Sequence, residues 1–257
     1  MYKVYQDFAE ELATLANPVV GRTFRTALEV EDKAAMNNTP VTIADKEIER
    51  LIRAEIETRF PDHGIYGEEH GQMGIDRDYV WVIDPIDGTQ AFILGMPTFG
   101  TLIGLQHKGL PVAGVIAMPA LGDTWSASVG DASLFNGKPC RTSEARNLED
   151  IQLVSTSIDM FDEEDLEAFD RLSSACKRRR FGGDCFSYGL LASGHVDLVV
   201  EADLQPYDYM ALIPVIEQAG GIISDWDGQP LHLRSDGRVV AAATRQLHES
   251  ALKVLAG

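Results

Sequence analysis

Hydrophobic residues recur at helical spacing in the first sixty residues and in short runs after them. Between residues 43 and 59, Ile48, Ile52 and Ile56 recur every four positions, and Phe60-Pro61 then ends the pattern. Apolar residues four apart lie on one face of a helix, so this segment is predicted to be an amphipathic helix. Helical spacing also predicts helices over 1–16 and 20–29.

Short apolar runs follow, and turn signals such as Lys108-Gly109 and Leu121-Gly122-Asp123 separate them. Runs of this length with glycine-containing connections are typical of antiparallel strands joined by tight turns. We therefore predict a meander whose strands cover 79–83, 99–106, 112–118 and 123–129.

The rest of the chain mixes the two patterns and predicts a layered α/β arrangement. The predicted elements are strand 151–156, helix 162–176, helix 184–193, strand 196–200, helix 208–219, strand 221–224, strand 239–243 and helix 245–255. No linker rich in Pro, Gly or Ser separates this part from the meander. We therefore expect two lobes that share an interface, residues 1–145 and 146–257.

The composition narrows the class of partner. The 257 residues include 40 acidic and 22 basic ones, which give a formal charge of −18 at pH 7. This charge repels nucleic acids and anionic membranes, so neither is expected as a partner. Cys140, Cys176 and Cys185 form no C-x-x-C pair, and no apolar run reaches the ~20 residues of a membrane span. We expect a soluble, cytoplasmic protein without disulfides.

The stretch W-V-I-D-P-I-D-G-T, residues 81–89, holds the strongest chemical signal. A hydrophobic strand is predicted to end at Asp84, and Pro85 then turns the chain so that Asp87 comes alongside. Two ionised carboxylates this close repel each other unless a cation lies between them or they share a proton. A divalent metal ion is the simplest solution. The alternative is structural, because Asp-Gly is also a common hairpin signal and 88–94 would then be the return strand.

Other acidic residues lie at the ends of predicted elements. Glu68-Glu69 follows a short H-G-I-Y segment, Asp45 lies in the first turn of the helix over 43–59, and Asp208 begins the helix over 208–219. Each has an ordinary explanation, as part of a solvated loop, as a helix cap or as a partner of the helix dipole. None of them identifies a site in isolation.

Together these stretches resemble the inositol monophosphatase superfamily of magnesium-dependent, lithium-sensitive phosphatases. The resemblance runs from about Lys33 to the C-terminus and rests on G-E-E, on W-V-I-D-P-I-D-G-T and on Y-D-Y-M-A-x5-E-Q-A-G-G. The chain is most similar to the histidinol-phosphate phosphatase branch, through P-V-T-I-A-D (40–45), F-G-T-L-I-G-L (99–105), the segment 180–201 and P-Y-D (206–208). The resemblance implies an α/β fold, a five-layered αβαβα sandwich of the inositol monophosphatase and fructose bisphosphatase type, and a homodimer.

The resemblance also implies which residues bind metal. It assigns one Mg²⁺ to Glu68, Asp84 and the backbone carbonyl of Ile86, and a second to Asp84, Asp87 and Asp208, with two or three Mg²⁺ in each site. All of these donors are oxygen atoms, which suit a hard ion such as Mg²⁺, whereas no imidazole or thiolate set favours zinc.

The implied chemistry is attack on a phosphate monoester by a metal-activated water. In this mechanism Glu68 accepts a proton, the hydroxyl of Thr89 orients the water, and Asp45 is the partner of Thr89. The phosphate is expected on the backbone N–H groups of Gly88 and Thr89, at the start of a helix. Lys33 resembles a lysine near an outer metal; an ordinary surface lysine is the alternative.

Recognition of the leaving group is expected from the second lobe. Asp184 begins the helix over 184–193, and Glu201 follows the strand over 196–200, seven residues before Asp208. Two carboxylates suit a cationic leaving group, and histidinol carries an ammonium group and an imidazole. We therefore favour L-histidinol phosphate as the substrate, a step of histidine biosynthesis. The alternatives are an inositol, sugar or nucleotide phosphatase with the same metal core, and a non-catalytic, acidic Ca²⁺-binding protein.

Overall fold

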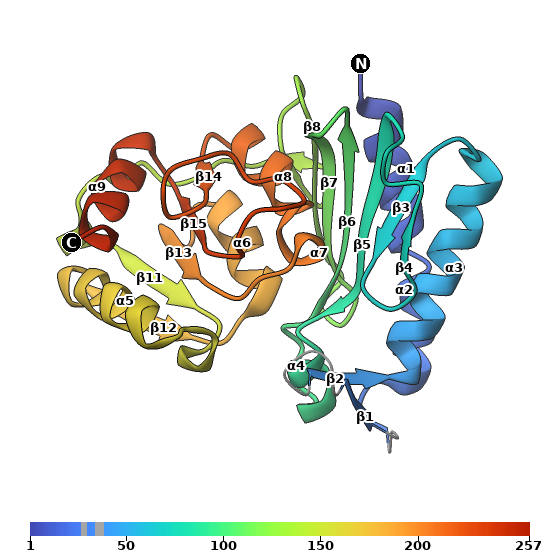
Figure 1. Cartoon of the computed structure of the whole chain (residues 1–257), viewed down its shortest axis with the longest axis horizontal. Helices are drawn as coiled ribbons and strands as arrows, with labels where there is room; N and C mark the ends of the chain where they lie inside the picture. The colour runs from blue at the N-terminus through green and yellow to red at the C-terminus, as the bar shows by residue number, and fades with distance from the viewer. Residues whose placement is uncertain (27–29, 34–38) are drawn as a thin grey trace.

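The computed structural model describes residues 1–26, 30–33 and 39–257 and shows two β-sheets that alternate with layers of helices (Figure 1). The helices are α1 (Lys3–Ala13), α2 (Ala16–Thr23), α3 (Ile43–Arg59), α4 (Thr89–Leu94), α5 (Glu163–Ala175), α6 (Asp184–Ala192), α7 (Pro206–Tyr209), α8 (Leu212–Gln218) and α9 (Arg245–Leu255). Helices α1 to α3 cover the outer face of the larger sheet, α6 and α8 lie between the sheets, and α5 and α9 cover the smaller sheet. The fold is the predicted five-layered αβαβα sandwich.

The larger sheet is built around a meander. Its strands are, in spatial order, β10 (Lys138–Pro139), β9 (Leu134–Phe135), β8 (Asp123–Ser128), β7 (Leu110–Met118), β6 (Gly100–His107), β5 (Tyr79–Asp87), β3 (Gly64–Gly67) and β4 (Gly71–Met73). Neighbouring strands are antiparallel except β3 and β5, which are parallel. Strands β5 to β7 are buried along most of their length because helices cover both faces. The predicted meander is confirmed.

The smaller sheet and a separate ribbon complete the strands of the described residues. The smaller sheet has the order β12 (Arg178–Phe181), β11 (Gln152–Ser155), β13 (Leu198–Glu201), β15 (Val239–Ala242) and β14 (Ile222–Ser224). Strand β11 is parallel to both β12 and β13, so the carboxyl ends of these three strands meet at one edge. The ribbon pairs β1 (Val30–Lys33) with β2 (Thr39–Thr42).

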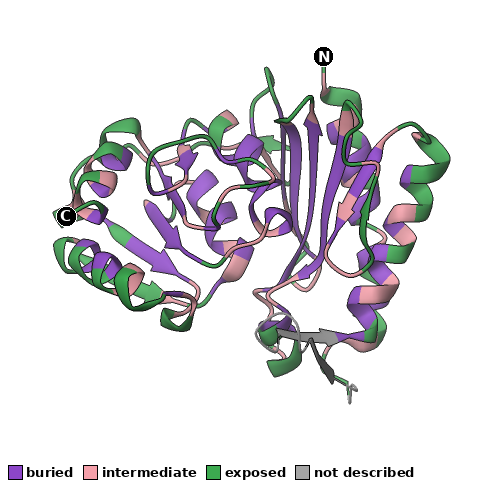
Figure 2. Ribbon diagram, in the orientation of Figure 1, coloured by how far each residue is buried: buried purple, intermediate pink, exposed green. Residues whose placement is uncertain are grey.

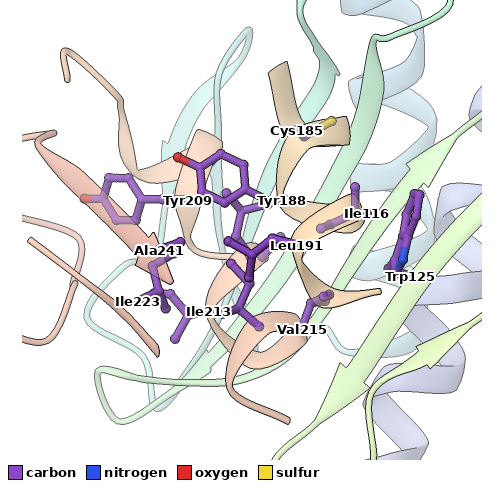
Figure 3. Packing of buried hydrophobic residues seen from close by; sticks show 14 of the residues in the cluster. Ile116, Trp125, Cys185, Tyr188, Leu191, Tyr209, Ile213, Val215, Ile223 and Ala241 are labelled. Carbon is purple, nitrogen blue, oxygen red and sulfur yellow. The ribbon is translucent and has the colours of Figure 1, made fainter. Parts of the chain in front are cut away.

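The central hydrophobic cluster joins the two sheets. Figure 3 shows Ile116 and Trp125 of the larger sheet with Leu191 of α6 and Val215 of α8, all of them buried. The outer helices bury the side that faces a sheet and expose the other (Figure 2). In α3 the buried side contains the regularly spaced isoleucines, and the predicted helix over 43–59 is confirmed. The division into lobes 1–145 and 146–257 stays a prediction.

The predicted helix over 20–29 is wrong at its start and over 24–26, because α2 begins at Ala16 and ends at Thr23; residues 27–29 lie outside the described part of the chain. Pro18 falls in the first turn of α2, where the missing N–H costs no intrahelical hydrogen bond. The ribbon, β4 and β12 were also not predicted. Strand β12 has the sequence R-R-R-F and is mostly exposed, so it carries no apolar alternation.

The single helix predicted over 208–219 is two short helices, α7 and α8. Pro214 lacks the N–H that a continuous helix would bond to the carbonyl of Met210. The interrupted backbone packs closely on β7, since a Cβ at Gly114 would lie 2.0 Å from the carbonyl oxygen of Ala211. Asp208 is therefore the third residue of α7 and does not begin a long helix.

Candidate metal centre

Asp84 and Asp87 both belong to β5, which continues past its predicted end at residue 83. Asp84 pairs with Leu102 and Asp87 with Gly100, and the ladder is irregular between these two pairs. In a regular strand, residues three apart point to opposite faces, and a bulge removes this restriction. The predicted turn at Pro85 is therefore wrong: an irregularity within the strand brings the two carboxylates together, at the kind of position where a sheet tolerates proline.

Gly88 connects β5 to α4. The segment over 89–94 is helical, so the alternative of a hairpin with a return strand is wrong. Gly88 has a φ of 80°, and a Cβ there would lie 2.8 Å from the Cγ of Asp184. Glycine satisfies both the positive φ and the close approach. The start of α6 therefore lies directly against this turn, where we expect the phosphate.

Asp84, Asp87 and Asp208 form a carboxylate cluster, with one oxygen from each within 4.8 Å of the others. Asp84 is buried and the other two are half-buried. The Oδ2 of Asp87 accepts the N–H of Cys185 at 2.6 Å, and the Oδ2 of Asp208 accepts the N–H of Gln205 at 2.6 Å. Among the described residues, the Oδ1 of Asp84 has no hydrogen-bond partner.

Burial and neighbouring negative charges raise the pKa of every carboxyl group in this cluster. Burial, followed by the charge of Asp208, raises the pKa of Asp87 to about 7. Burial also raises the pKa of Asp208 to about 8, with a further contribution from the charge of Glu68. The pKa of Asp84 is raised well above its usual range by burial and by the charges of Glu68 and Asp87. A cation in the cluster would relieve this repulsion.

The cluster fits a hard divalent cation. Its donors are carboxylate oxygens, which Mg²⁺ prefers, and the buried Oδ1 of Asp84 has no hydrogen-bond partner among the described residues. Glu68 follows β3, and its N–H donates to the carbonyl of Ile83 in β5 at 3.2 Å, so Glu68 lies beside the residue before Asp84. The structure thus brings Asp84, Asp87 and Asp208 together and places the backbone of Glu68 beside β5, while the metal-binding roles of these residues and of the Ile86 carbonyl stay predictions.

Asp45 and Thr89 form a buried pair next to the cluster. The Oδ2 of Asp45 accepts the N–H and the hydroxyl of Thr42, at 2.9 and 2.6 Å, as part of a capping box at the start of α3. Its Oδ1 lies 3.3 Å from the hydroxyl of Thr89, which is also 3.0 Å from the carbonyl oxygen of Ile86. Burial raises the pKa of Asp45 to about 6. Asp45 therefore caps a helix and contacts Thr89 at the same time.

A cavity of about 120 Å³ adjoins the cluster, and both predicted recognition residues, Asp184 and Glu201, line it. Glu201 is buried, and its carboxylate accepts the N–H and hydroxyl of Thr156, at 2.9 and 2.6 Å, and the hydroxyl of Tyr188 at 2.8 Å. Asp184 is half-buried with a φ of 45°, and burial, followed by the charge of Asp87, raises its pKa to about 8.

Thr156 and Tyr188 were not predicted as site residues. Thr156 directly follows β11, whose carboxyl end meets that of β13 because the two strands are parallel. Residues at the carboxyl ends of neighbouring parallel strands lie side by side, so the strand order could have predicted Thr156 beside Glu201. Tyr188 lies one helical turn after Asp184 on α6 and had no such signal. Lys33 ends β1, and its side chain lies outside the described part of the chain.

Comparison with known proteins identifies the family. The model of the inositol monophosphatase family matches residues 1–256. The bifunctional phosphatase IMPL2, chloroplastic, of Arabidopsis thaliana is 42% identical over 253 residues, which cover 95% of this chain and 72% of that protein. The histidinol-phosphatase of Chlorobaculum parvum is 36% identical over 235 residues, which cover 91% and 90%. The structure of an inositol monophosphatase from Zymomonas mobilis has a TM-score of 0.90 and 38% identity, with 100% of this chain and 99% of that chain covered. The chain therefore belongs to the inositol monophosphatase family.

Proposed function

We propose that the protein is a Mg²⁺-dependent phosphatase that hydrolyses L-histidinol phosphate to L-histidinol and inorganic phosphate. The observation that carries the proposal is the position of Asp184 and Glu201 on the cavity beside the carboxylate cluster. A leaving alcohol in this cavity faces carboxylates, which form strong hydrogen bonds with an ammonium or imidazolium group. The likeness to a histidinol-phosphatase supports the same substrate.

The metal-binding residues in this proposal are Glu68, Asp84, Asp87, Asp208 and the carbonyl of Ile86, which would hold two or three Mg²⁺. A Mg²⁺ ion held there would supply positive charge that acidifies the attacking water and neutralises charge on the phosphate. Glu68 has a second task, since its carboxylate takes up the proton that the attacking water loses.

Thr89 orients the attacking water in this proposal. A hydroxyl group has one proton, and donation of that proton to Asp45 leaves the oxygen lone pairs of Thr89 to accept a hydrogen bond from the water. The phosphate binds the backbone N–H groups of Gly88 and Thr89, where helix α4 begins. Lys33 near an outer metal stays a prediction.

Inositol 1-phosphate is the second candidate substrate, because the Zymomonas mobilis protein is an inositol monophosphatase. It would use the same metal cluster, as would a sugar or nucleotide phosphate, and would differ in its contacts with Asp184 and Glu201. A non-catalytic Ca²⁺-binding protein is disfavoured, because it leaves the Thr89–Asp45 pair beside the cluster without a role.

Initial rates with L-histidinol phosphate and inositol 1-phosphate at fixed Mg²⁺ test the proposal. We expect kcat/KM to be at least about tenfold higher for histidinol phosphate, since one charge-assisted hydrogen bond contributes ~1.5–3 kcal/mol. Equal values, or a preference for inositol 1-phosphate, would overturn the substrate and leave the phosphatase standing. Absence of Mg²⁺-dependent phosphate release from both compounds and from an aryl phosphate would overturn the phosphatase itself.

We also propose that the enzyme is a cytoplasmic homodimer. Among the described residues, no helix has both the length and the apolar character that a membrane span requires. The three cysteines are free, which agrees with the proposed reducing cytoplasm. A homodimer without a nucleic-acid partner completes the proposal, on the basis of the family resemblance and the formal charge of −18.

A further inference from the structure

Glu49 of α3 is a buried acidic residue outside the predicted site. Its side chain is 0% exposed, and its Oε1 accepts a hydrogen bond from the Nε of Arg53, one turn later, at 2.6 Å. A buried carboxylate needs such a partner, so the pair alone could be purely structural. Glu49 also makes contacts that an ion pair does not require.

These contacts hold the loop between β3 and β4, which carries Glu68. The N–H of Glu69 donates to the Oε2 of Glu49 at 2.6 Å, and the N–H of His70 donates to its Oε1 at 3.2 Å. Hydrogen bonds to an ionised acceptor are about twice as strong as those between neutral groups. The carboxylate of Glu49 therefore binds the two backbone positions that directly follow Glu68.

The residues on either side of this loop show the same close packing against α3. A Cβ on Gly67, the residue before Glu68, would lie 2.0 Å from the Oε1 of Glu49 and 2.7 Å from the Nη2 of Arg53. Arg53 also donates a hydrogen bond to the carbonyl of Gly71, where β4 begins. The G-E-E motif thus needs glycine at its first position because a carboxylate from α3 occupies the space of a side chain.

We infer that Glu49 is a positioning residue, whose carboxylate fixes the loop over 68–70 and so directs Glu68 toward the carboxylate cluster. This inference rests on the proposed function, in which Glu68 binds metal and accepts a proton. On the other side, the N–H of Glu68 donates to the carbonyl of Ile83. The loop is therefore held between α3 and β5, and loss of the Glu49 contacts frees one side of it.

Glu49→Gln and the matched control Glu47→Gln test this role. Glu47 lies on the same helix and is half-buried, but its carboxylate accepts from the Nη2 of Arg22 at 3.0 Å. Calorimetry on the metal-free proteins should show Mg²⁺ affinity about 10- to 100-fold lower in Glu49→Gln, the range typical of residues that support metal ligands, and nearly unchanged in Glu47→Gln. KM for the substrate should stay the same at saturating Mg²⁺.

Hydrogen exchange gives a readout that needs neither metal nor substrate. In metal-free Glu49→Gln, the amides of Glu69 and His70 should exchange faster than in the wild type, because they lose an ionised acceptor. Gly67→Ala reaches the same contact from the loop and serves if Glu49→Gln does not fold. It should lower Mg²⁺ affinity by a similar factor, and wild-type affinity in a folded Gly67→Ala protein would overturn the inference.

The outcomes separate this inference from the proposed function. If the wild type binds Mg²⁺ and Glu68→Gln weakens that binding, while Glu49→Gln binds within about threefold of wild type, well short of the usual effect of a supporting residue, the positioning role is wrong and the phosphatase stands. If the wild type does not bind Mg²⁺, both are wrong. Weaker binding in Glu49→Gln with faster loop exchange supports both.

Discussion

Two acidic residues, Glu201 on the cavity and Asp84 in the carboxylate cluster beside it, have opposite surroundings. Glu201 and Asp84 are equally buried, each with 2% of its surface exposed. Glu201 receives three hydrogen bonds, two from Thr156 and one from Tyr188. Within the described residues, the Oδ1 of Asp84 receives none, and its neighbours are further carboxylates. The two residues are therefore equally buried, but the carboxylate of Glu201 is hydrogen-bonded, whereas that of Asp84 is repelled by neighbouring carboxylates.

This difference separates a carboxylate whose hydrogen-bond donors come from the protein from one that needs a bound ligand. Burial raises the pKa of Glu201, and the hydrogen bonds from Thr156 and Tyr188 offset part of that rise. For Asp84, burial and the neighbouring charges all act in the same direction and raise the pKa. A buried carboxylate without donors is costly to the fold, and a bound cation offsets that cost. We therefore interpret the aspartate cluster as a metal site and Glu201 as a fixed group for recognition.

The largest effect is expected from Asp84→Asn. It removes the charge shared by the proposed metals, so kcat should fall by more than about 100-fold, beyond the range for residues that only support metal ligands. The metal-free variant should be at least as stable as wild type at neutral pH, because a repelling buried carboxylate is gone. Phosphate release and thermal unfolding measure the two effects. A variant with more than about a tenth of the wild-type kcat, a loss below ~1.4 kcal/mol, would contradict the metal assignment.

Thr89→Ala should have the next largest effect, on kcat with little change in KM. In the proposed mechanism the hydroxyl orients the water and does not bind the substrate, so its loss should lower kcat by about 100-fold. Thr89→Ser is the matched control, since it keeps the hydroxyl and should retain most of the activity. A raised KM with unchanged kcat in steady-state kinetics would instead assign Thr89 to substrate binding.

Glu201→Gln tests the proposed recognition role of the hydrogen-bonded carboxylate. The loss of one charge-assisted contact with a cationic leaving group should lower kcat/KM for L-histidinol phosphate about 10- to 100-fold, mainly through KM. Inositol 1-phosphate, whose alcohol is uncharged, is the internal control and should be affected much less. Equal losses on both substrates would show that Glu201 supports the site without recognising the charge.

The sequence was enough to predict Asp84 and Glu201 as site residues, but it did not predict the backbone and the hydrogen-bond donors around them. Helix α3 and the meander have a repeating apolar pattern, so local spacing was enough to predict them. Asp84 and Asp87 were predicted by motif, but the irregularity that brings them together was mistaken for a turn. Such an irregularity depends on pairing with β6, which lies further along the chain, and therefore leaves little local signal.

Long-range packing explains the other differences between the predicted and the observed structure. The break between α7 and α8 combines Pro214, which the sequence shows, with the close approach of Ala211 to Gly114, which it does not. Thr156 meets Glu201 across 45 residues, so only the strand order reveals the contact. The sequence could therefore predict which acids are candidates, whereas the presence or absence of donors around each acid required the fold.

The smallest expected effect concerns the stability of the metal-free protein. Burial and then the charge of Asp208 raise the pKa of Asp87 to about 7, whereas an unfolded chain has about 3.9. Asp87 therefore contributes its full stability only below the unfolded pKa, and that contribution is lost as the pH rises through about 7. Relative to Asp87→Asn, the wild type should lose at least about 2–4 °C of Tm, or about 1 kcal/mol, between pH of about 5.5 and 8.5. The difference between the two proteins cancels the effect of His63 and His248, whose pKa burial lowers.

Mg²⁺ should reverse this trend in the wild type. The ion competes with protons for the same carboxylates, so it should raise Tm more at the higher pH than at the lower one. In Asp87→Asn one of these carboxylates is gone, and the Mg²⁺-dependent increase should be smaller at both pH values. Thermal unfolding of both proteins, with and without Mg²⁺ at each pH value, measures these differences. Parallel pH curves for the two metal-free proteins would show that burial and the charge of Asp208 do not raise the pKa of Asp87, and the contrast between the aspartate cluster and Glu201 would then be wrong.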